Sequence, residues 1–244
     1  MRNAWIVARR ELGAIFVQPI AYIFAIMMTL VVGLIFAAQI SFPTFQGSGP
    51  PPTLSQVLNT FCFLAIFGAP AITMRLLSEE QQTGTIELLM TLPLRDIEVV
   101  VGKFLAAFLT YATVTALTLI YPVILLRFGN PDVGPLVSSY LGVLLWGASI
   151  LGIGLLASAM SENQINAFML AFGLILVLYL TTIPAELFSV NQPWSTVLSE
   201  LSLQDHLNGF LFGLITVKDV LYFLIITAVS LFAAARVLES RRWR

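Results

Sequence analysis

Six long runs of apolar residues, each without a charged side chain at its centre, dominate the sequence. A run of about 18 or more such residues can cross the hydrocarbon core of a bilayer as a helix. Only 10% of the chain is charged, against roughly a quarter in soluble domains, so polar side chains are too few to cover a water-exposed surface. The sequence therefore predicts an all-α polytopic membrane protein. The expected spans are about residues 20–38, 57–74, 104–126, 136–160, 165–184 and 219–236.

The Lys and Arg residues are distributed unevenly between the two ends of these runs. Positive side chains near the ends of spans collect on the cytoplasmic side of a membrane. If both termini are cytoplasmic, ten of the 12 lie inside and only Arg127 and Lys218 lie outside. We therefore expect both termini in the cytoplasm. The ten inner residues are Arg2, Arg9, Arg10, Arg75, Arg95, Lys103, Arg236, Arg241, Arg242 and Arg244.

The segments outside the runs have distinct compositions. Residues 1–18 place apolar side chains at helical spacing among charged ones, which predicts an amphipathic helix lying in the membrane interface. Residues 39–56 are uncharged and rich in Gly and Pro, which predicts an outer loop. Residues 199–215 are apolar enough to dip into the membrane as short outer helices. The expected division is an interfacial helix at 1–18, one transmembrane domain at 19–237, and a basic cytoplasmic tail at 238–244.

Residues with catalytic or metal-binding chemistry are scarce. The single histidine, His206, falls in the outer segment and is interpreted as a satisfied polar residue of a folded loop. The single cysteine, Cys62, excludes a disulfide or a multi-thiolate metal site within the chain. Glu79 and Glu80 at a membrane boundary suggest an intramembrane protease, but the spans supply no histidine or further acid to activate water. We therefore expect neither enzyme activity nor a cofactor or metal in this chain.

An energy source for transport is also missing from the sequence. Ion-coupled carriers usually keep charged groups near mid-membrane, and these spans have none there. The pair Gly102-Lys103 lacks the preceding glycine and the following Ser or Thr of a phosphate loop. If the protein moves a substrate uphill, its energy must therefore come from another chain that docks on the cytoplasmic side.

A charged stretch, LLSEEQQTGTIELLMTLPLRDIEVVVGKF, joins the second and third spans and holds five of the 13 acids. Gly84 breaks the helix, and Thr85 can cap a new one in which Glu87 suits the helix dipole. Pro93 ends that short helix. The residues alone leave two interpretations open, a solvated loop and a rigid helix that docks a partner.

This stretch resembles a family signature. AITMRLLSEEQQTGTIELLMTLPLRDIEVVVGKF is similar to the TMR-x-x-(S/D)E-x-x-x-GT-(I/L)ELL-x-T-x-P-L…GK pattern of ABC-2-type transporter permeases. More narrowly, it resembles the gliding-motility-type (Gld) permease subunit. Similar segments recur in PIAYIF, FGNPDVGPLVSSYLG, SENQINAF and DHLNGFLFGLITVKDVLYF, so the resemblance covers about residues 10 to 237.

The resemblance implies the partners and the site of this chain. Such permeases have six spans, an N-terminal elbow helix, and a coupling helix between spans two and three that docks a separate ABC ATPase. They pair with a second permease subunit, identical or different, which can carry a large outer domain. The resemblance places the coupling element at about residues 78–93 and a second inner contact at Glu162 and Asn163. The matching residues are Ser78, Glu79, Gly84, Thr85, Glu87, Leu88 and Pro93.

We therefore expect the permease subunit of an ABC transporter in a bacterial inner membrane. ATP and Mg²⁺ would bind to the partner ATPase, membrane lipid would surround the spans, and no nucleic acid is expected. Hydrolysis would drive transport or mechanical work outside the membrane. An alternative is a membrane anchor that recruits an ATPase for signalling or a mechanical function without moving a substrate.

Overall fold

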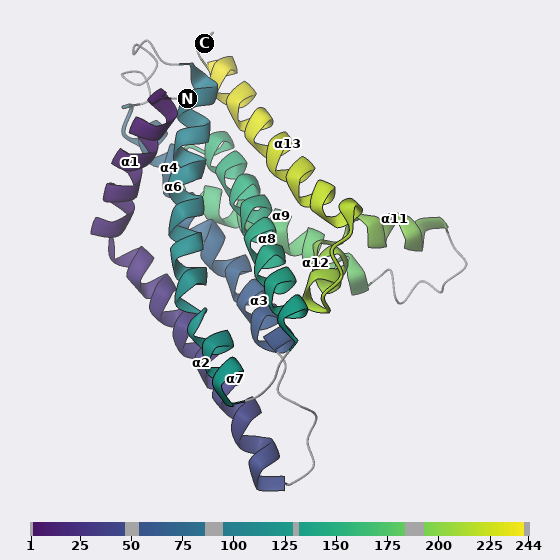
Figure 1. Cartoon of the computed structure of the whole chain (residues 1–244). Coiled ribbons are helices and arrows are strands. Elements are labelled where there is room, and N and C mark those ends of the chain that lie inside the picture. Colours follow the sequence, from purple (N-terminus) through teal and green to yellow (C-terminus); the bar gives the residue numbers. More distant parts are fainter. Residues whose placement is uncertain (1, 47–53, 86–94, 129–131, 184–192, 242–244) are drawn as a thin grey trace.

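The computed structural model describes residues 2–46, 54–85, 95–128, 132–183 and 193–241, and within these ranges the regular elements are helices. The helices form a bundle in which the two chain termini lie at the same end, here called the terminal end (Figure 1). The opposite end is called the distal end. The helices are α1 (Arg2–Val17), α2 (Pro19–Gln46), α3 (Leu54–Thr73), α4 (Arg75–Gln82), α6 (Asp96–Leu117), α7 (Ile120–Phe128), α8 (Val133–Met160), α9 (Gln164–Leu180), α11 (Pro193–Leu201), α12 (Leu203–Leu211) and α13 (Val217–Arg241).

Five helical segments are long and apolar enough to cross a bilayer, which confirms a helical protein with multiple candidate spans. The expected span at 165–184 corresponds to α9, whose 17 residues fall below the length of the other five. Six spans therefore remain a prediction. The five segments are Ala21–Ser41, Leu54–Gln82, Asp96–Arg127, Val133–Met160 and Val217–Ser240.

Several helix ends differ from the boundaries expected from the sequence. Helix α2 continues to Gln46, through the first half of the expected outer loop, because the apolar pattern persists to Phe45. The helical segment that begins with the second apolar run does not end at residue 74, because α4 follows α3 after a single turn residue, Met74. Helix α13 likewise runs on to Arg241, into the expected tail. The described chain is therefore more helical near its loops than its composition indicates.

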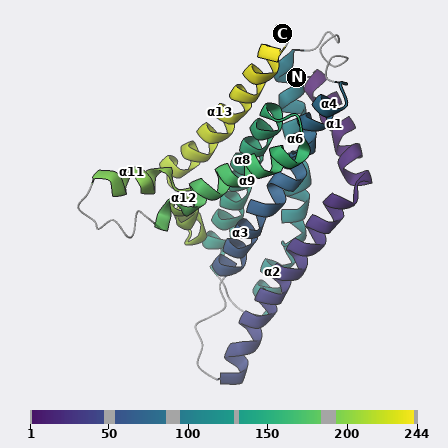
Figure 2. The same ribbon diagram turned by 180° about the vertical axis from the view of Figure 1, so that it is seen from behind.

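Helix α8 forms the centre of the bundle, between α13 on one side and α3 and α9 on the other (Figures 1 and 2). Small residues let its neighbours approach closely. A methyl group added at Gly147 would lie 2.0 Å from the Tyr111 ring, and one at Gly154 would lie 2.2 Å from the Thr73 hydroxyl. The buried indole of Trp146 packs between the rings of Tyr179 and Phe223. The contacts of α8 therefore position the flanking spans.

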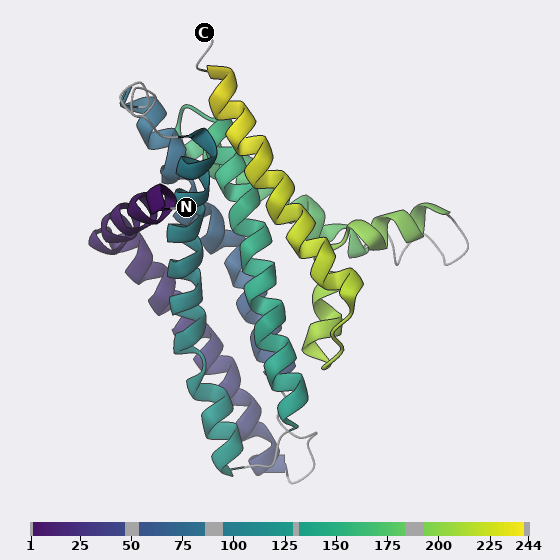
Figure 3. The ribbon, with the colours of Figure 1, turned by 45° about the horizontal axis from the view of Figure 1, so that its top comes forward.

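Two short helices, α11 and α12, are present where the sequence predicts short helices, and α11 projects sideways from the bundle (Figure 3). Their location on the outer side of the membrane remains a prediction. The last carbonyl groups of a helix have no partner within it, and lipid offers none. Side chains from the neighbouring helices supply the missing donors. Ser138 donates to the Phe210 carbonyl at 2.8 Å, and Ser55 donates to the Leu211 carbonyl at 2.8 Å. These hydroxyls attach the end of α12 to α8 and α3.

Replacing Ser55 and Ser138 together with alanine is expected to destabilise the fold by at most about 1 kcal/mol for each hydroxyl, because the carbonyls of α12 lose their closest side-chain donors. Longer contacts remain, from Ser139 at 3.3 and 3.5 Å and from the Gly213 N–H to the Phe210 carbonyl at 3.2 Å. Reversible unfolding in mixed micelles measures this change. Ser149→Ala is the matched control, because that hydroxyl bonds only within its own helix, to the Trp146 carbonyl at 2.8 Å. Equal losses in the double variant and the control would contradict the assignment.

Candidate functional site

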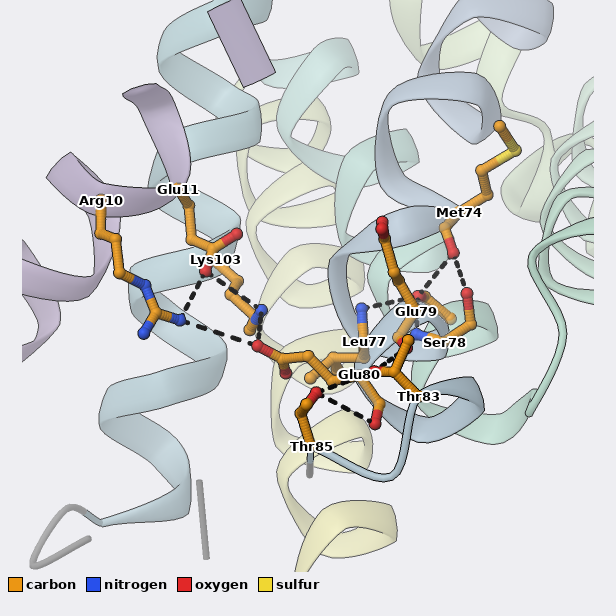
Figure 4. A network of polar contacts seen from close by, with 11 residues as sticks. Arg10, Glu11, Met74, Leu77, Ser78, Glu79, Glu80, Thr83, Thr85 and Lys103 are labelled. Atoms are coloured by element: carbon orange, nitrogen blue, oxygen red, sulfur yellow. Dashed lines mark hydrogen bonds and ion pairs between the residues drawn. The ribbon is translucent and has the colours of Figure 1, made fainter. Parts of the chain in front are cut away.

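A buried lysine links three helices at the terminal end of the bundle. The Lys103 side chain on α6 is only 1% exposed. Its Nζ atom lies 2.9 Å from Glu80 Oε1 on α4 and 3.4 Å from Glu11 Oε1 on α1 (Figure 4). Burying an ammonium group without a partner is strongly unfavourable, so the two carboxylates are needed to hold the charge in this position.

Arg10 completes the group of charges. Its guanidinium donates to Glu11 Oε1 at 2.9 Å and lies 3.7 Å from Glu80 Oε1. The hydrogen bond to Glu11 raises the pKa of Arg10, so its charge is fixed at any physiological pH. The two bases and two acids balance, and we call Arg10, Glu11, Glu80 and Lys103 the charge cluster. The cluster joins α1, α4 and α6 without a net charge.

Helix α1 approaches α6 closely enough to bring Glu11 to Lys103. A methyl group added at Gly102 would lie 2.7 Å from the Ala4 carbonyl oxygen and 2.8 Å from Val7 Cβ. Ala4, Val7 and Ala8 are accordingly buried, whereas Trp5 is 58% exposed. The N-terminal segment is thus helical, as expected, and its small residues face the bundle while its indole faces outward.

Helix α4 is also attached to α8 and α9. Ser158 Oγ on α8 accepts hydrogen bonds from the backbone N–H groups of Leu77 and Ser78, at 3.0 and 3.1 Å. Arg75 donates to Gln164 on α9 at 3.0 Å and to Gln18, between α1 and α2, at 2.9 Å. Together with the charge cluster, these bonds link α4 to α1, α6, α8 and α9.

The C-terminal end of α4 needs a glycine for its conformation. Gly84 has a φ of +72°, and its N–H donates to the Gln81 carbonyl at 3.3 Å. An added methyl group would meet nothing within 4 Å, so the backbone conformation rather than space requires glycine there. The Thr83 and Thr85 hydroxyls lie 2.9 Å apart on the exposed surface beside it. The chain therefore leaves α4 in a defined direction.

A cleft of about 300 Å³ opens between α1 and α4. Both signs of charge line it, with partners already within the chain for its two cations. Among the described residues, no group of three or more His, Cys, Asp or Glu could hold a metal ion. The arrangement suits a polar contact surface. Its charged and amide lining residues are Glu11, Gln18, Arg75, Glu79, Glu80 and Lys103.

The residues that the sequence assigns to the coupling element differ in their exposure to solvent. Ser78 is fully buried, and its hydroxyl donates to the Met74 carbonyl, so it faces the bundle. Glu79 is 43% exposed and lies 3.5 Å from Arg75, while Gly84 and Thr85 are exposed. Glu87, Leu88 and Pro93 lie outside the described residues.

The second predicted contact begins α9. The Asn163 side chain accepts a hydrogen bond from the Ile165 N–H at 2.9 Å and so caps the helix, and Glu162 beside it is exposed. The next residue, Gln164, bonds Arg75 of the α4 segment. Residues adjacent to the two predicted contact regions are thus joined by a hydrogen bond.

Sequence reasoning missed the charge cluster. It assigned Lys103, Arg10 and Arg75 only to the cytoplasmic side and attached no structural role to them. One signal was available, because Lys103 stands in an otherwise apolar run from Val99 to Ala107. A lysine in such a run needs an acid from another segment, but the sequence does not say which one.

Comparison with known proteins identifies related transporter components. The profile of a family described as "ABC-2 family transporter protein" matches residues 35–236. Two curated relatives named "Probable multidrug ABC transporter permease YbhR", from Escherichia coli K12 and O157:H7, are each 28% identical to the chain over 116 residues. The match covers 48% of this chain and 31% of each relative. The matched region is therefore about a third of the length of these curated relatives.

Lys103→Met is expected to lower the free energy of unfolding by about 3 kcal/mol, because it leaves the partly buried carboxylates of Glu11 and Glu80 close together with only the largely exposed Arg10 as their cation. Adding Glu80→Gln should recover part of that loss. Lys218→Met is the control, because Lys218 is 61% exposed and its pair with Glu200 is worth at most about 1 kcal/mol. Unfolding curves for the four proteins test this, and a loss no larger than that of the control would contradict a structural role for the charge cluster.

Proposed function

The chain belongs to the ABC-2 transporter family, and from that premise we propose that it is the membrane-spanning permease subunit of an ATP-driven transporter. In this proposal a separate ABC ATPase binds ATP and Mg²⁺ and docks at the terminal end of the bundle. A second permease subunit, identical or different, completes the membrane part. The observation that carries the proposal is the attachment of α4, which leads into the family's docking segment, to four neighbouring elements of the bundle.

We propose that the terminal end faces the cytoplasm of a bacterial inner membrane. Arg127 lies in the last turn of α7, which carries no other basic residue. Lys218 lies in the first turn of α13, whereas Arg236 and Arg241 lie near the other end of that helix. That distribution follows the tendency of basic residues to stay inside. In this arrangement α1 is the elbow helix, and α9 with the residues that follow it forms the fifth of six spans.

The proposed docking surface consists of the exposed edge of α4 and the segment that follows it, residues 78–93. Its accessible described positions are Glu79 and residues 82–85. Ser78 faces inward and acts by holding α4 to α8 through the shared acceptor Ser158. Glu162 and Asn163, at the start of α9, form the proposed second contact.

The contacts of α4 suggest how a movement of the ATPase reaches the membrane. Helix α4 follows α3 directly, and Lys103 ties it to α6 through Glu80 and, through Glu11, to α1. A push on α4 therefore cannot be absorbed by bending one loop. We propose that α1, α4 and the start of α6 move as one body and shift the α3 and α6 spans, producing transport or mechanical work outside the membrane.

A photo-reactive amino acid placed at Thr85 is expected to crosslink to the ATPase subunit in membranes, because Thr85 lies on the exposed edge of the docking surface. Mass spectrometry of the product identifies the subunit by its phosphate-binding motif. Lys218 is the matched control position, since its side chain is 61% exposed and it lies in the first turn of α13, at the end of that helix opposite to Arg241. Capture of the ATPase from Lys218, or none from Thr85, would contradict docking at this surface.

Cysteine labelling tests the orientation separately from docking. The only native cysteine, Cys62, is fully buried and can be replaced by alanine. In spheroplasts, a membrane-impermeant maleimide is expected to label Lys218→Cys at once, because that side chain is 61% exposed, and Gln82→Cys only after permeabilisation. The reverse order of labelling would show that the terminal end faces outward.

A further inference from the structure

A second polar cluster lies where α11, α12 and α13 meet, away from the proposed docking surface. His206 on α12 is only 4% exposed. Its Nδ1 atom lies 2.6 Å from Asp219 Oδ1, and its Nε2 atom lies 3.1 Å from the backbone oxygen of Glu200. The ring stacks on Tyr222 with centroids 3.9 Å apart and an interplanar angle of 20°. Both ring nitrogens therefore face oxygen atoms.

These contacts cannot both be hydrogen bonds if the histidine is neutral and the aspartate is ionised. A backbone carbonyl and an ionised carboxylate only accept hydrogen bonds, and a neutral imidazole has a single N–H to donate. One ring nitrogen and the oxygen that it faces would then both present lone pairs, with no proton between them. One additional proton removes the conflict, and we propose that His206 and Asp219 together form a proton-binding site that is occupied at neutral pH.

The surroundings favour the ring as the position of this proton. The Thr216 hydroxyl donates to Asp219 Oδ2 at 2.5 Å, which suits an ionised carboxylate. The face of the Tyr222 ring attracts a cation stacked on it, and so favours a charged imidazole. Thr216 thus favours an ionised Asp219, and Tyr222 favours a charged His206. Both effects place the proton on the ring.

The other charged groups near the pair do not replace Asp219. Glu200 and Lys218 pair with each other at 2.5 Å and carry opposite charges. Asp205 lies in the first turn of α12, the helix that carries His206. Its backbone N–H donates a hydrogen bond to the Ser202 hydroxyl oxygen at 3.1 Å. The Tyr222 hydroxyl donates to the Leu201 carbonyl at 2.6 Å. Asp219 is the carboxylate in contact with the ring.

The bound proton connects the C-terminal end of α11 to the start of α13. When it leaves, the Nε2 atom and the Glu200 carbonyl, or the Nδ1 atom and Asp219, become two facing acceptors. Loss of the proton therefore removes one of the two hydrogen bonds by which His206 joins α11 and α13. This outer region thus contains a site that responds to protons and is independent of the ATPase docking surface.

Nitrogen NMR of ¹⁵N-histidine-labelled protein in nanodiscs at pH 7.5 tests the site, because the chain has one histidine and gives one pair of ring signals. An ordinary imidazole is only about a tenth protonated at that pH. We expect both ring nitrogens of the wild type to carry protons. In Asp219→Asn we expect one protonated and one unprotonated nitrogen. Glu200→Gln is the control, because it removes a nearby carboxylate but keeps the backbone carbonyl, and it should leave both protons in place.

Infrared spectroscopy covers the other position of the proton. If Asp219 carries it, one ring nitrogen is unprotonated and a carboxylic acid band appears that Asp219→Asn removes, and the site is still occupied. A wild-type ring with one unprotonated nitrogen at pH 7.5, and no such band, would overturn the proposal. The wild-type measurement decides this even if Asp219→Asn does not fold.

Discussion

The contact on which the terminal end depends is the buried ammonium group of Lys103. An ammonium with 1% exposure is tolerated only where carboxylates meet it, and here one comes from α1 and the other from α4. The three helices are therefore stable in this arrangement only together. Apolar side chains could not impose the same dependence, because lipid surrounds an apolar helix as readily as another helix does. A charge thus determines the packing at the end of the bundle where we propose that an ATPase docks.

The outer part of the bundle satisfies a different requirement. Short helices that end among the spans leave carbonyl groups without water, and side chains from four helices act as donors to them. Ser55 and Ser138 bond the end of α12, and Tyr222 with His206 bonds the end of α11. Hydrogen bonds to the carbonyl groups at helix ends are the main polar contacts of this region, whereas the ion pairs of Lys103 link the helices at the terminal end. In our proposals the two ends respond to different signals, a partner protein at one and protons at the other.

The features that the sequence predicted are those that depend on local pattern. Apolar runs revealed the candidate spans, and the spacing in residues 1–18 indicated α1. The ion pairs of Lys103 were not predictable, because its partners come from segments that the sequence does not place beside it. The inward orientation of Ser78 was missed for the same reason. The Ser78 backbone N–H bonds Ser158 of α8, a segment that the sequence does not place beside it.

Distance measurement between spin labels on α1 and α4 tests most directly the claim that these helices move as one body. Gly13 and Gln82 are both exposed, and an added side chain at Gly13 meets nothing within 4 Å. With cysteines at both positions and Cys62 replaced by alanine, pulsed electron paramagnetic resonance reports their separation in the complex with the ATPase. We predict one narrow distribution that is the same with and without bound ATP, and a broad one in Lys103→Met. A wild-type distance that changes when ATP binds would contradict the account.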